Sequence, residues 1–193
     1  MNTRVSIKLV TYDVYTALLD IEGSLVPVVQ RAFNLDAIIA TTFVRLWRAK
    51  QMERAAISNS LGIKRTSFRD CTVMALDYCL GRHSLSALPD VRRDLVFAWD
   101  TMNPWPEADA AIAAVRARAC QTAILSNGDQ DMLEAVARNF SPQTFDYILS
   151  SETAGHYTPH PSVYEIPSIA LGIAKENIVH VAGSSNDVLG TIA

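Results

Sequence analysis

The chain opens on the run Val5-Ser6-Ile7-Lys8-Leu9-Val10-Thr11-Tyr12-Asp13, which continues through Val14-Tyr15-Thr16-Ala17-Leu18-Leu19-Asp20. Its β-branched and aliphatic residues predict a buried strand that ends at Asp13. An acid at that place is poorly suited to packing, but open α/β sheets bind their ligands at the carboxyl ends of their strands. A lone aspartate there more often caps a turn, so the rest of the chain has to decide its role.

The bulk properties describe an ordinary globular protein. The 193 residues suffice for one domain with an insertion or for two small domains. A hydrophobic content of 49% allows a sizeable core. A net charge of -3 argues against a nucleic-acid or anionic-membrane partner.

The sequence shows no secretory signal and no window of the roughly 18 apolar residues that a membrane helix needs. The cysteines, Cys71, Cys79 and Cys120, are odd in number, so they cannot all pair within the chain, and they lack the spacing of metal ligands. We interpret His156, His160 and His180 as residues that bind no metal. We expect a cytoplasmic protein with reduced cysteines and no metal site.

Residues 21–102 read as helices without a convincing strand. Apolar residues recur at helical spacing from Asp36 to Ile57, with Asp36 as a possible N-cap, and two further helices are predicted near Thr66–Ser67 and after Pro89. This segment is therefore predicted to be a helical cap domain inserted after the first strand.

The pattern then alternates between helix and strand. Strands are predicted at 122–125, 145–149 and 177–182, and helices from Pro106 to about Ala119, from Asp129, and over 162–171 despite Pro167. Such alternation implies a parallel sheet with right-handed crossovers. We expect residues 1–20 and 103–193 to form an α/β core, a Rossmann-like parallel sheet flanked by helices.

The predicted strands all end in small polar or acidic residues. These ends are Asp13, Ser126, Ser150–Ser151 and Gly183–Asp187. In a parallel sheet they lie along one edge, so two acids and several hydroxyls are predicted to gather at one site. This convergence favours a chemical role for Asp13 over a turn cap.

Five segments carry a resemblance to a known family. They are Tyr12-Asp13-Val14-Tyr15-Thr16-Ala17-Leu18, Leu46-Trp47-Arg48-Ala49-Lys50-Gln51-Met52-Glu53, Ile124-Leu125-Ser126-Asn127-Gly128, Tyr157-Thr158-Pro159-His160-Pro161-Ser162-Val163-Tyr164-Glu165 and Val181-Ala182-Gly183-Ser184-Ser185-Asn186-Asp187-Val188-Leu189-Gly190. In this order they resemble the motifs of the haloacid dehalogenase superfamily, and within it those of the L-2-haloacid dehalogenases.

The resemblance implies hydrolysis of short-chain (S)-2-haloalkanoic acids to (R)-2-hydroxy acids without a metal or cofactor. Asp13 would displace the halide and form an ester, which water would then hydrolyse with Asp187 as its base. Arg48 from the cap would receive the halide. Thr158 stands at the remaining catalytic position, where the family has a lysine that pairs with the nucleophile.

The resemblance also implies a set of substrate-binding residues. Asn127 and Tyr15 would line the halide cradle, Ser126 would hold the substrate carboxylate, Tyr164 would support the third motif, and Ser184 would complete the set. Apolar walls could come from Phe43, Trp47 and Trp105, for which core packing is the alternative role.

Three departures from the family pattern concern the nucleophile. Thr158 replaces a lysine, Ala17 replaces a threonine whose hydroxyl would bond Asp13, and Thr16 replaces a glycine. Lys8 and Lys175 are the candidates for a substitute cation, although nothing in the sequence places either of them near Asp13.

Three alternatives to an active dehalogenase remain open. The first is a catalytically impaired relative. The second is a phosphatase of the same superfamily, disfavoured because Tyr15 stands where such an enzyme has its general acid and because the fourth motif supplies one carboxylate, Asp187. The third is an interaction protein that uses the helical segment.

The resemblance also leads us to expect a homodimer. The chain also stops just inside the helix after Asp187, where relatives continue, so we expect a truncated form or an open sheet edge.

Overall fold

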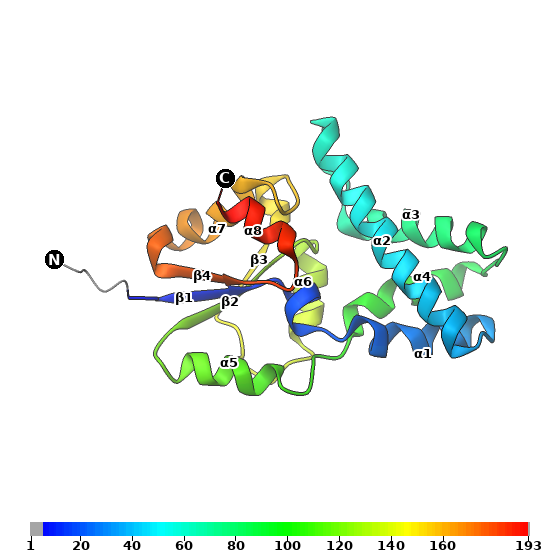
Figure 1. The fold of residues 1–193 in the computed structure, drawn as a ribbon, viewed down its shortest axis with the longest axis horizontal. Helices are drawn as coiled ribbons and strands as arrows, with labels where there is room; N and C mark the ends of the chain where they lie inside the picture. The colour runs from blue at the N-terminus through cyan, green and yellow to red at the C-terminus, as the bar shows by residue number, and fades with distance from the viewer. Residues whose placement is uncertain (1–5, 193) are drawn as a thin grey trace. The chain divides into compact units, whose positions relative to one another are not determined.

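The computed structural model describes residues 6–192 (Figure 1). The chain forms two compact units. The α/β unit comprises the residues up to Leu19 and those from Pro104 onward, and the helical unit comprises Asp20–Asn103. Residues 1–5 and 193 of the expected core domain, including Val5 of the expected first strand, lie outside the described residues.

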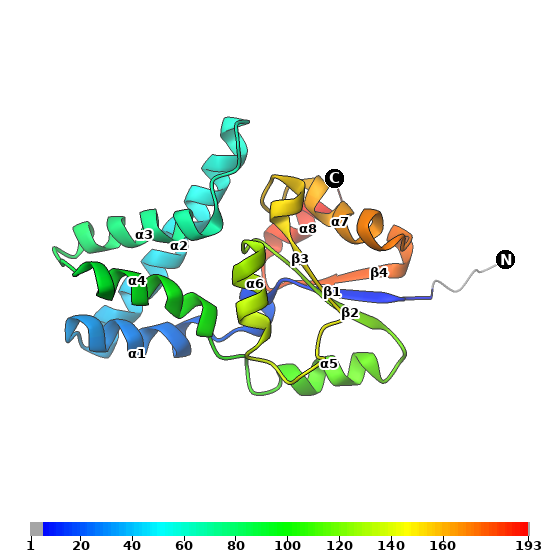
Figure 2. The same cartoon turned by 180° about the vertical axis from the view of Figure 1, so that it is seen from behind.

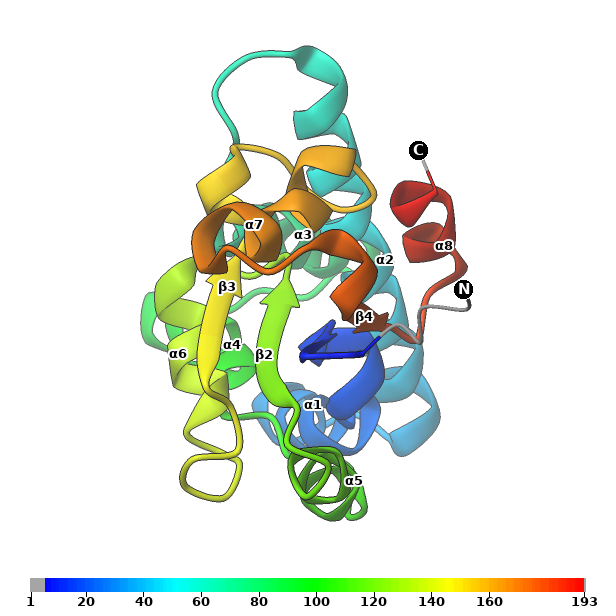
Figure 3. The same ribbon diagram turned by 90° about the vertical axis from the view of Figure 1, so that its left-hand side faces the viewer.

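Four parallel strands form the sheet of the α/β unit, in the order β3-β2-β1-β4. They are β1 (Leu9–Tyr12), β2 (Gln121–Ser126), β3 (Tyr147–Ser150) and β4 (Ile178–Val181). Figure 3 shows β3 and β2 side by side, with α7 above the sheet and α5 below it. The predicted parallel α/β sheet is confirmed.

The first strand occupies the middle of this sheet and is buried along its whole length. Tyr12 pairs with Ile124 of β2 on one side and with Val181 of β4 on the other. The chain leaves the strand through a π-helical turn, η1 (Val14–Leu18). Such turns are rare and are found frequently at functional sites.

The remaining helices of the α/β unit alternate with its strands, and α8 follows β4. They are α5 (Ala108–Arg116), α6 (Gln130–Ala137), α7 (Pro161–Leu171) and α8 (Ser185–Thr191), with the short 3-10 turns η3 (Ser151–Ala154) and η4 (Lys175–Asn177). α5 ends before the predicted Ala119, which has a left-handed φ of 58°. Asp129 precedes α6, but its side chain makes no capping hydrogen bond.

The helical unit consists of α1 (Ile21–Phe33), α2 (Ala37–Leu61), α3 (Phe68–Arg82), α4 (Pro89–Phe97) and the 3-10 turn η2 (Ala98–Thr101), seen from behind in Figure 2. Residues 20–103 are all described and contain no strand. The side chain of Asp36 accepts a hydrogen bond from the Ile39 amide, and that of Ser67 accepts one from the Asp70 amide. These caps and Pro89 in the first turn of α4 confirm the predicted helix starts.

Aromatic side chains fill the centre of the helical unit. Phe43, Trp47 and Trp99 are fully buried, and the rings of Trp47 and Trp99 meet edge to face with their centroids 5.3 Å apart. The Trp47 indole Nε1 donates to the Thr72 carbonyl at 2.9 Å, which joins α2 to α3. Core packing is therefore the observed role of Phe43 and Trp47. No helix within residues 6–192 is long and apolar enough to cross a bilayer.

We expect Trp47→Ala to lower the free energy of unfolding by about 3–5 kcal/mol, the usual cost of removing a buried large aromatic ring. Urea denaturation followed by circular dichroism measures this change. The control is Ile38→Ala on the same helix, where the side chain is 81% exposed and the expected change is within about 0.5 kcal/mol. Equal losses in the two variants would contradict the assigned core.

Candidate active site

The Asp13 carboxylate lies at the carboxyl end of β1 and is held by two hydroxyl groups. Ser126 Oγ, from the end of β2, donates to Asp13 Oδ1 at 2.5 Å, and Thr16 Oγ1 donates to Oδ2 at 2.5 Å. The side chain is buried, so its charge depends on such donors in place of water. Each carboxylate oxygen thus has a hydroxyl donor from a neighbouring segment.

Thr16 also joins the end of β1 to the loop that follows β4. Its hydroxyl accepts a hydrogen bond from the Gly183 amide at 3.1 Å while it donates to Asp13. Gly183 approaches so closely that an added Cβ would lie 2.3 Å from the Thr16 carbonyl oxygen. No sequence pattern indicates this role, because Thr16 stands where the motif that it resembles has a turn glycine.

Ser126 makes a contact that the sequence pattern does not predict. Its side chain is fully buried and its hydroxyl donates to Asp13, while a role in holding the substrate carboxylate stays a prediction. A serine hydroxyl has a single proton, so it cannot donate to a second carboxylate at the same time. In this structure Ser126 therefore supports Asp13.

Asn127 and Thr158 are joined by two hydrogen bonds. The Thr158 amide donates to Asn127 Oδ1 at 2.8 Å, and Asn127 Nδ2 donates to Thr158 Oγ1 at 2.9 Å. Tyr15 belongs to the same region, since an added Cβ on Gly128 would lie 2.9 Å from the Tyr15 hydroxyl. The loop after β2 therefore packs both against the turn after β1 and against the segment that carries Thr158.

Asp187 is a second buried carboxylate at this end of the sheet. Tyr164 donates to its Oδ1 at 2.6 Å, and His180 Nε2 lies 3.7 Å from the same oxygen. Burial alone would raise the pKa of Asp187, but His180 and Tyr164 outweigh it and lower that pKa below its ordinary value. Burial, followed by the hydrogen bond to Asp187, raises the pKa of Tyr164, which therefore remains a protonated donor.

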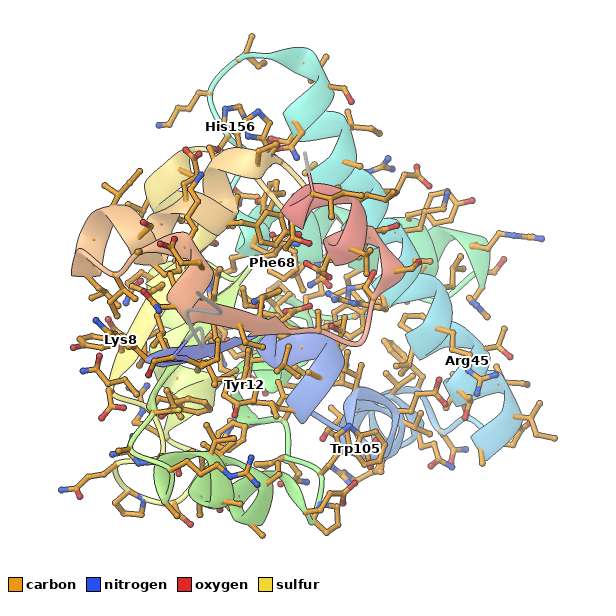
Figure 4. The ribbon with its side chains drawn as sticks, turned by 60° about the vertical axis from the view of Figure 1, so that its left-hand side comes forward. Lys8, Tyr12, Arg45, Phe68, Trp105 and His156 are labelled. Atoms are coloured by element: carbon orange, nitrogen blue, oxygen red, sulfur yellow. The ribbon has the colours of Figure 1, made fainter. Side chains whose placement is uncertain are left out.

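Neither lysine suggested as a substitute cation lies near Asp13. Lys8 precedes β1 at the end opposite Asp13, and five residues of strand span roughly 16 Å; Figure 4 shows Lys8 and Tyr12 at separate places along this strand. Lys175 lies in η4, before β4, and pairs with Glu165 at 2.7 Å. In the described part of the α/β unit, no lysine or arginine pairs with Asp13 or Asp187.

Arg48 lies in the helical unit, where a glutamine orients it. Arg48 Nη1 donates to Gln51 Oε1 at 2.6 Å, and Gln51 Nε2 donates to Thr72 Oγ1 at 2.6 Å. Gln51 is fully buried, so its amide is fixed from both sides. The spacing of three residues on one helix is a signal by which Gln51 could have been found from the sequence.

The other predicted residues have mainly structural positions. Ser184 caps α8, where its Oγ accepts a hydrogen bond from the Asn186 amide at 3.2 Å. Trp105 is 41% exposed in the α/β unit. The cysteines are free, and burial raises the pKa of Cys79 to about 12.

A parallel α/β sheet with two buried carboxylates at the ends of its strands is typical of an enzyme whose active site is built on carboxylates. The sequence matches the family described as haloacid dehalogenase-like hydrolase over residues 7–193. The chain belongs to this family.

Several similar proteins with curated names are dehalogenases. The chain is 33% identical to haloacetate dehalogenase H-2 of Moraxella sp. (strain B) over 77% of its own length and 66% of that protein. It is 30% identical to the (S)-2-haloacid dehalogenase of Xanthobacter autotrophicus over 95% of its own length and 70% of that protein. The chain thus spans about two thirds of the length of these relatives.

The solved structure of the L-2-haloacid dehalogenase from Xanthobacter autotrophicus has the same fold. It superposes with a TM-score of 0.86 at 29% identity, over 95% of this chain and 73% of that one. A second structure of that enzyme, with chloropropionic acid covalently bound, also superposes with a TM-score of 0.86.

We expect Tyr164→Phe to destabilise the protein most at neutral pH, by about 1.5–3 kcal/mol, the contribution of a hydrogen bond to a charged group. The folded-state pKa of Asp187 is lowered, so its ionised form stabilises the fold above the unfolded value of about 3.9, and this contribution is lost as the pH falls through the folded value. The stability difference between native and variant should therefore shrink on acidification. Urea denaturation between pH 7 and pH 3 measures it.

The control for this series is Tyr147→Phe. The Tyr147 hydroxyl accepts a hydrogen bond from Gln121 Nε2 and has no carboxylate partner. Its stability difference should not depend on pH in this range. A difference for Tyr164→Phe that stays constant with pH would contradict the assigned contact with the ionised form of Asp187.

Proposed function

We propose that the protein hydrolyses the carbon–halogen bond of short-chain (S)-2-haloalkanoic acids and releases (R)-2-hydroxy acids. The observation that carries this proposal is the Asp13 carboxylate at the end of β1, held by the hydroxyls of Ser126 and Thr16. The relative from Xanthobacter autotrophicus supports it, because its structure holds chloropropionic acid covalently. The reaction needs a carboxylate nucleophile that is held in position, and the Asp13 carboxylate is held in this way.

In the first step a carboxylate oxygen of Asp13 attacks C2 of the substrate. The C2–halogen bond breaks as the new C–O bond forms, and the halide leaves with the bonding electrons. Attack from the side opposite the halide inverts C2, so the product has the (R) configuration. The hydroxyls of Ser126 and Thr16 restrict the rotation of the carboxylate and so orient it for attack.

In the second step water attacks the carbonyl carbon of the ester on Asp13. Asp187 takes a proton from this water, a role that requires the ionised carboxylate which its lowered pKa provides at neutral pH. The bond between the carbonyl carbon and the substrate oxygen then breaks, and the hydroxy acid leaves. Asp13 is regenerated as a carboxylate.

The halide and the substrate carboxylate need cations or polar hydrogens that the α/β unit supplies only in part. We assign the halide to Arg48, oriented by Gln51, and place the helical unit as a cap over the substrate. Tyr15 and Asn127 would complete the halide cradle. A cytoplasmic setting and a homodimer belong to the same proposal.

A phosphatase reaction is the weaker alternative, since Tyr15 stands at the position where a phosphatase has its general acid.

A dehalogenase with impaired activity is the stronger alternative. The family lysine is replaced by Thr158, and in the described residues the hydroxyl of Thr158 bonds to Asn127. A hydrogen bond to a charged group contributes about 1.5–3 kcal/mol, whereas a cation 4 Å from a carboxylate contributes about 4 kcal/mol at an effective dielectric constant of 20. The hydroxyls that donate to Asp13, those of Ser126 and Thr16, therefore supply only part of what a lysine would supply.

We expect the native protein to release chloride from L-2-chloropropionate, and not from the D isomer, in metal-free buffer. Asp13→Asn should reduce this rate at least about a thousandfold, because removing a covalent nucleophile costs on the order of 10⁶ in a comparable hydrolase. A chloride assay with chiral analysis of the 2-hydroxypropionate measures both. Release that survives Asp13→Asn would refute the mechanism.

The same assay distinguishes the alternatives. No chloride from the native protein, with release restored in Thr158→Lys, would identify an impaired relative. Metal-dependent hydrolysis of a phosphate ester would identify a phosphatase.

We expect Thr16→Val to reduce chloride release about 10- to 100-fold, the equivalent of one hydrogen bond to a charged group. The valine has nearly the same shape but cannot donate to Asp13 or accept from the Gly183 amide. Thr16→Ser keeps the hydroxyl and should stay within about threefold of the native rate if the hydroxyl is what matters. Equal activity of the valine and native proteins would show that Ser126 alone positions Asp13.

A further inference from the structure

His180 has a buried side chain next to Asp187. It has no step of its own in the reaction proposed above. It lies on β4, where Nδ1 is 2.9 Å from Thr11 Oγ1 and Nε2 is 3.7 Å from Asp187 Oδ1. Nε2 is buried and makes no hydrogen bond to any described residue. The Tyr164 ring packs edge-on against the imidazole at 5.5 Å between centroids. Nδ1 of His180 therefore has a hydrogen-bond partner. Nε2 faces the Asp187 carboxylate at a distance too long for a hydrogen bond.

The hydrogen-bond pattern favours one neutral tautomer. Thr11 Oγ1 donates to the Val179 carbonyl at 3.5 Å, so it can accept from His180 Nδ1–H. Nε2 then carries a lone pair directed at Asp187. The 3.7 Å between Nε2 and Asp187 Oδ1 is longer than a hydrogen bond, so the two atoms share no proton in this structure. An imidazole in this tautomer is ready to take up a proton from the Asp187 side.

A cavity of about 360 Å³ lies on the same side of the sheet, between α7, β4 and α8, and is lined by His180, Thr11 and Tyr164 among others. Glu165 and Lys175 also line it, and they form an exposed ion pair. The titratable groups around His180 are thus Asp187, Tyr164, Glu165 and Lys175. The cavity connects the imidazole side of the site with exposed residues.

The proposed reaction releases one proton in a buried place at every turnover. Water gives one proton to Asp187 when it attacks the ester, and its remaining hydrogen ends on the hydroxyl of the departing hydroxy acid as Asp13 regains its charge. Substrate and water therefore become hydroxy acid, halide and one proton, which remains on Asp187. Asp187 is only 5% exposed, so this proton needs a route to solvent before the next turnover.

We propose that His180 and Thr11 carry this proton from Asp187 to the cavity, an inference that rests on the proposed function. The lone pair on His180 Nε2 accepts the proton from Asp187 Oδ1, which leaves Asp187 ionised and the imidazole positively charged. The Nδ1 proton then passes to Thr11 Oγ1, whose own proton moves to water in the cavity. The Nδ1–H form is restored when Nδ1 regains a proton from water through Thr11 and Nε2 loses the proton it carries, so the ring ends neutral and the net proton has passed to solvent.

The test is His180→Gln, which keeps a polar side chain of similar length but accepts no proton at neutral pH. In a rapid-mixing experiment with L-2-chloropropionate, the initial burst of chloride should be unchanged. Hydrolysis of the ester should slow about 100-fold, the usual contribution of a positioned acid–base group. Mass spectrometry of the quenched protein should show the ester accumulating on Asp13. His83→Gln, in the helical unit, is the control and should retain the native kinetics.

A second variant separates proton transfer from packing. His180→Ala should slow the hydrolysis step similarly, and added imidazole, which can enter the space left beside the cavity, should restore it at least tenfold. Native hydrolysis rates in His180→Gln, or a slow His180→Ala that imidazole does not restore, would overturn the relay while leaving the proposed function intact. Absence of chloride release from the native protein would overturn both.

Discussion

The site depends on the hydrogen bonds that fix the Asp13 carboxylate at the end of the central strand. A buried carboxylate without donors is strongly destabilising, so the two hydroxyls from Ser126 and Thr16 are a condition for the fold as well as for the chemistry. Ser126 can reach Asp13 only because β1 and β2 are parallel neighbours in a fixed register. The strand order therefore also determines where the Asp13 carboxylate can be held.

The turn after β1 determines which hydroxyl reaches the second carboxylate oxygen. The π-helical turn η1 places the Thr16 side chain back over Asp13 and against the Gly183 amide. The family motif that this segment resembles has a glycine at this position and a threonine at the next, where this chain has Ala17. The exchange of these two residues thus moves the hydroxyl by one position and does not remove it. The absent lysine is different, because a hydroxyl cannot supply its charge.

The sequence was sufficient to predict the parallel sheet, the helical segment and the gathering of Asp13, Ser126 and Asp187 at one edge, since these follow from strand periodicity and strand ends. It did not reveal the role of Thr16, because no periodicity encodes a π-helical turn. Nor did it reveal the hydrogen bond from Ser126 to Asp13, because a side-chain partner depends on side-chain direction. His180 was accessible in principle: it alternates with the exposed Val179 and Val181, so it shares the covered face of β4.

The two carboxylates have different surroundings, and this difference divides the work between them. Among the described residues, the side-chain donors to Asp13 are hydroxyls on short side chains, which orient it and leave its oxygens able to attack carbon. Asp187 faces a phenol and an imidazole, both of which can take part in proton transfer. A nucleophile is best held by donors that do not exchange protons, since a carboxylate that gains a proton cannot attack. A base needs the opposite, a neighbour that removes the proton it has accepted, and for Asp187 that neighbour is His180.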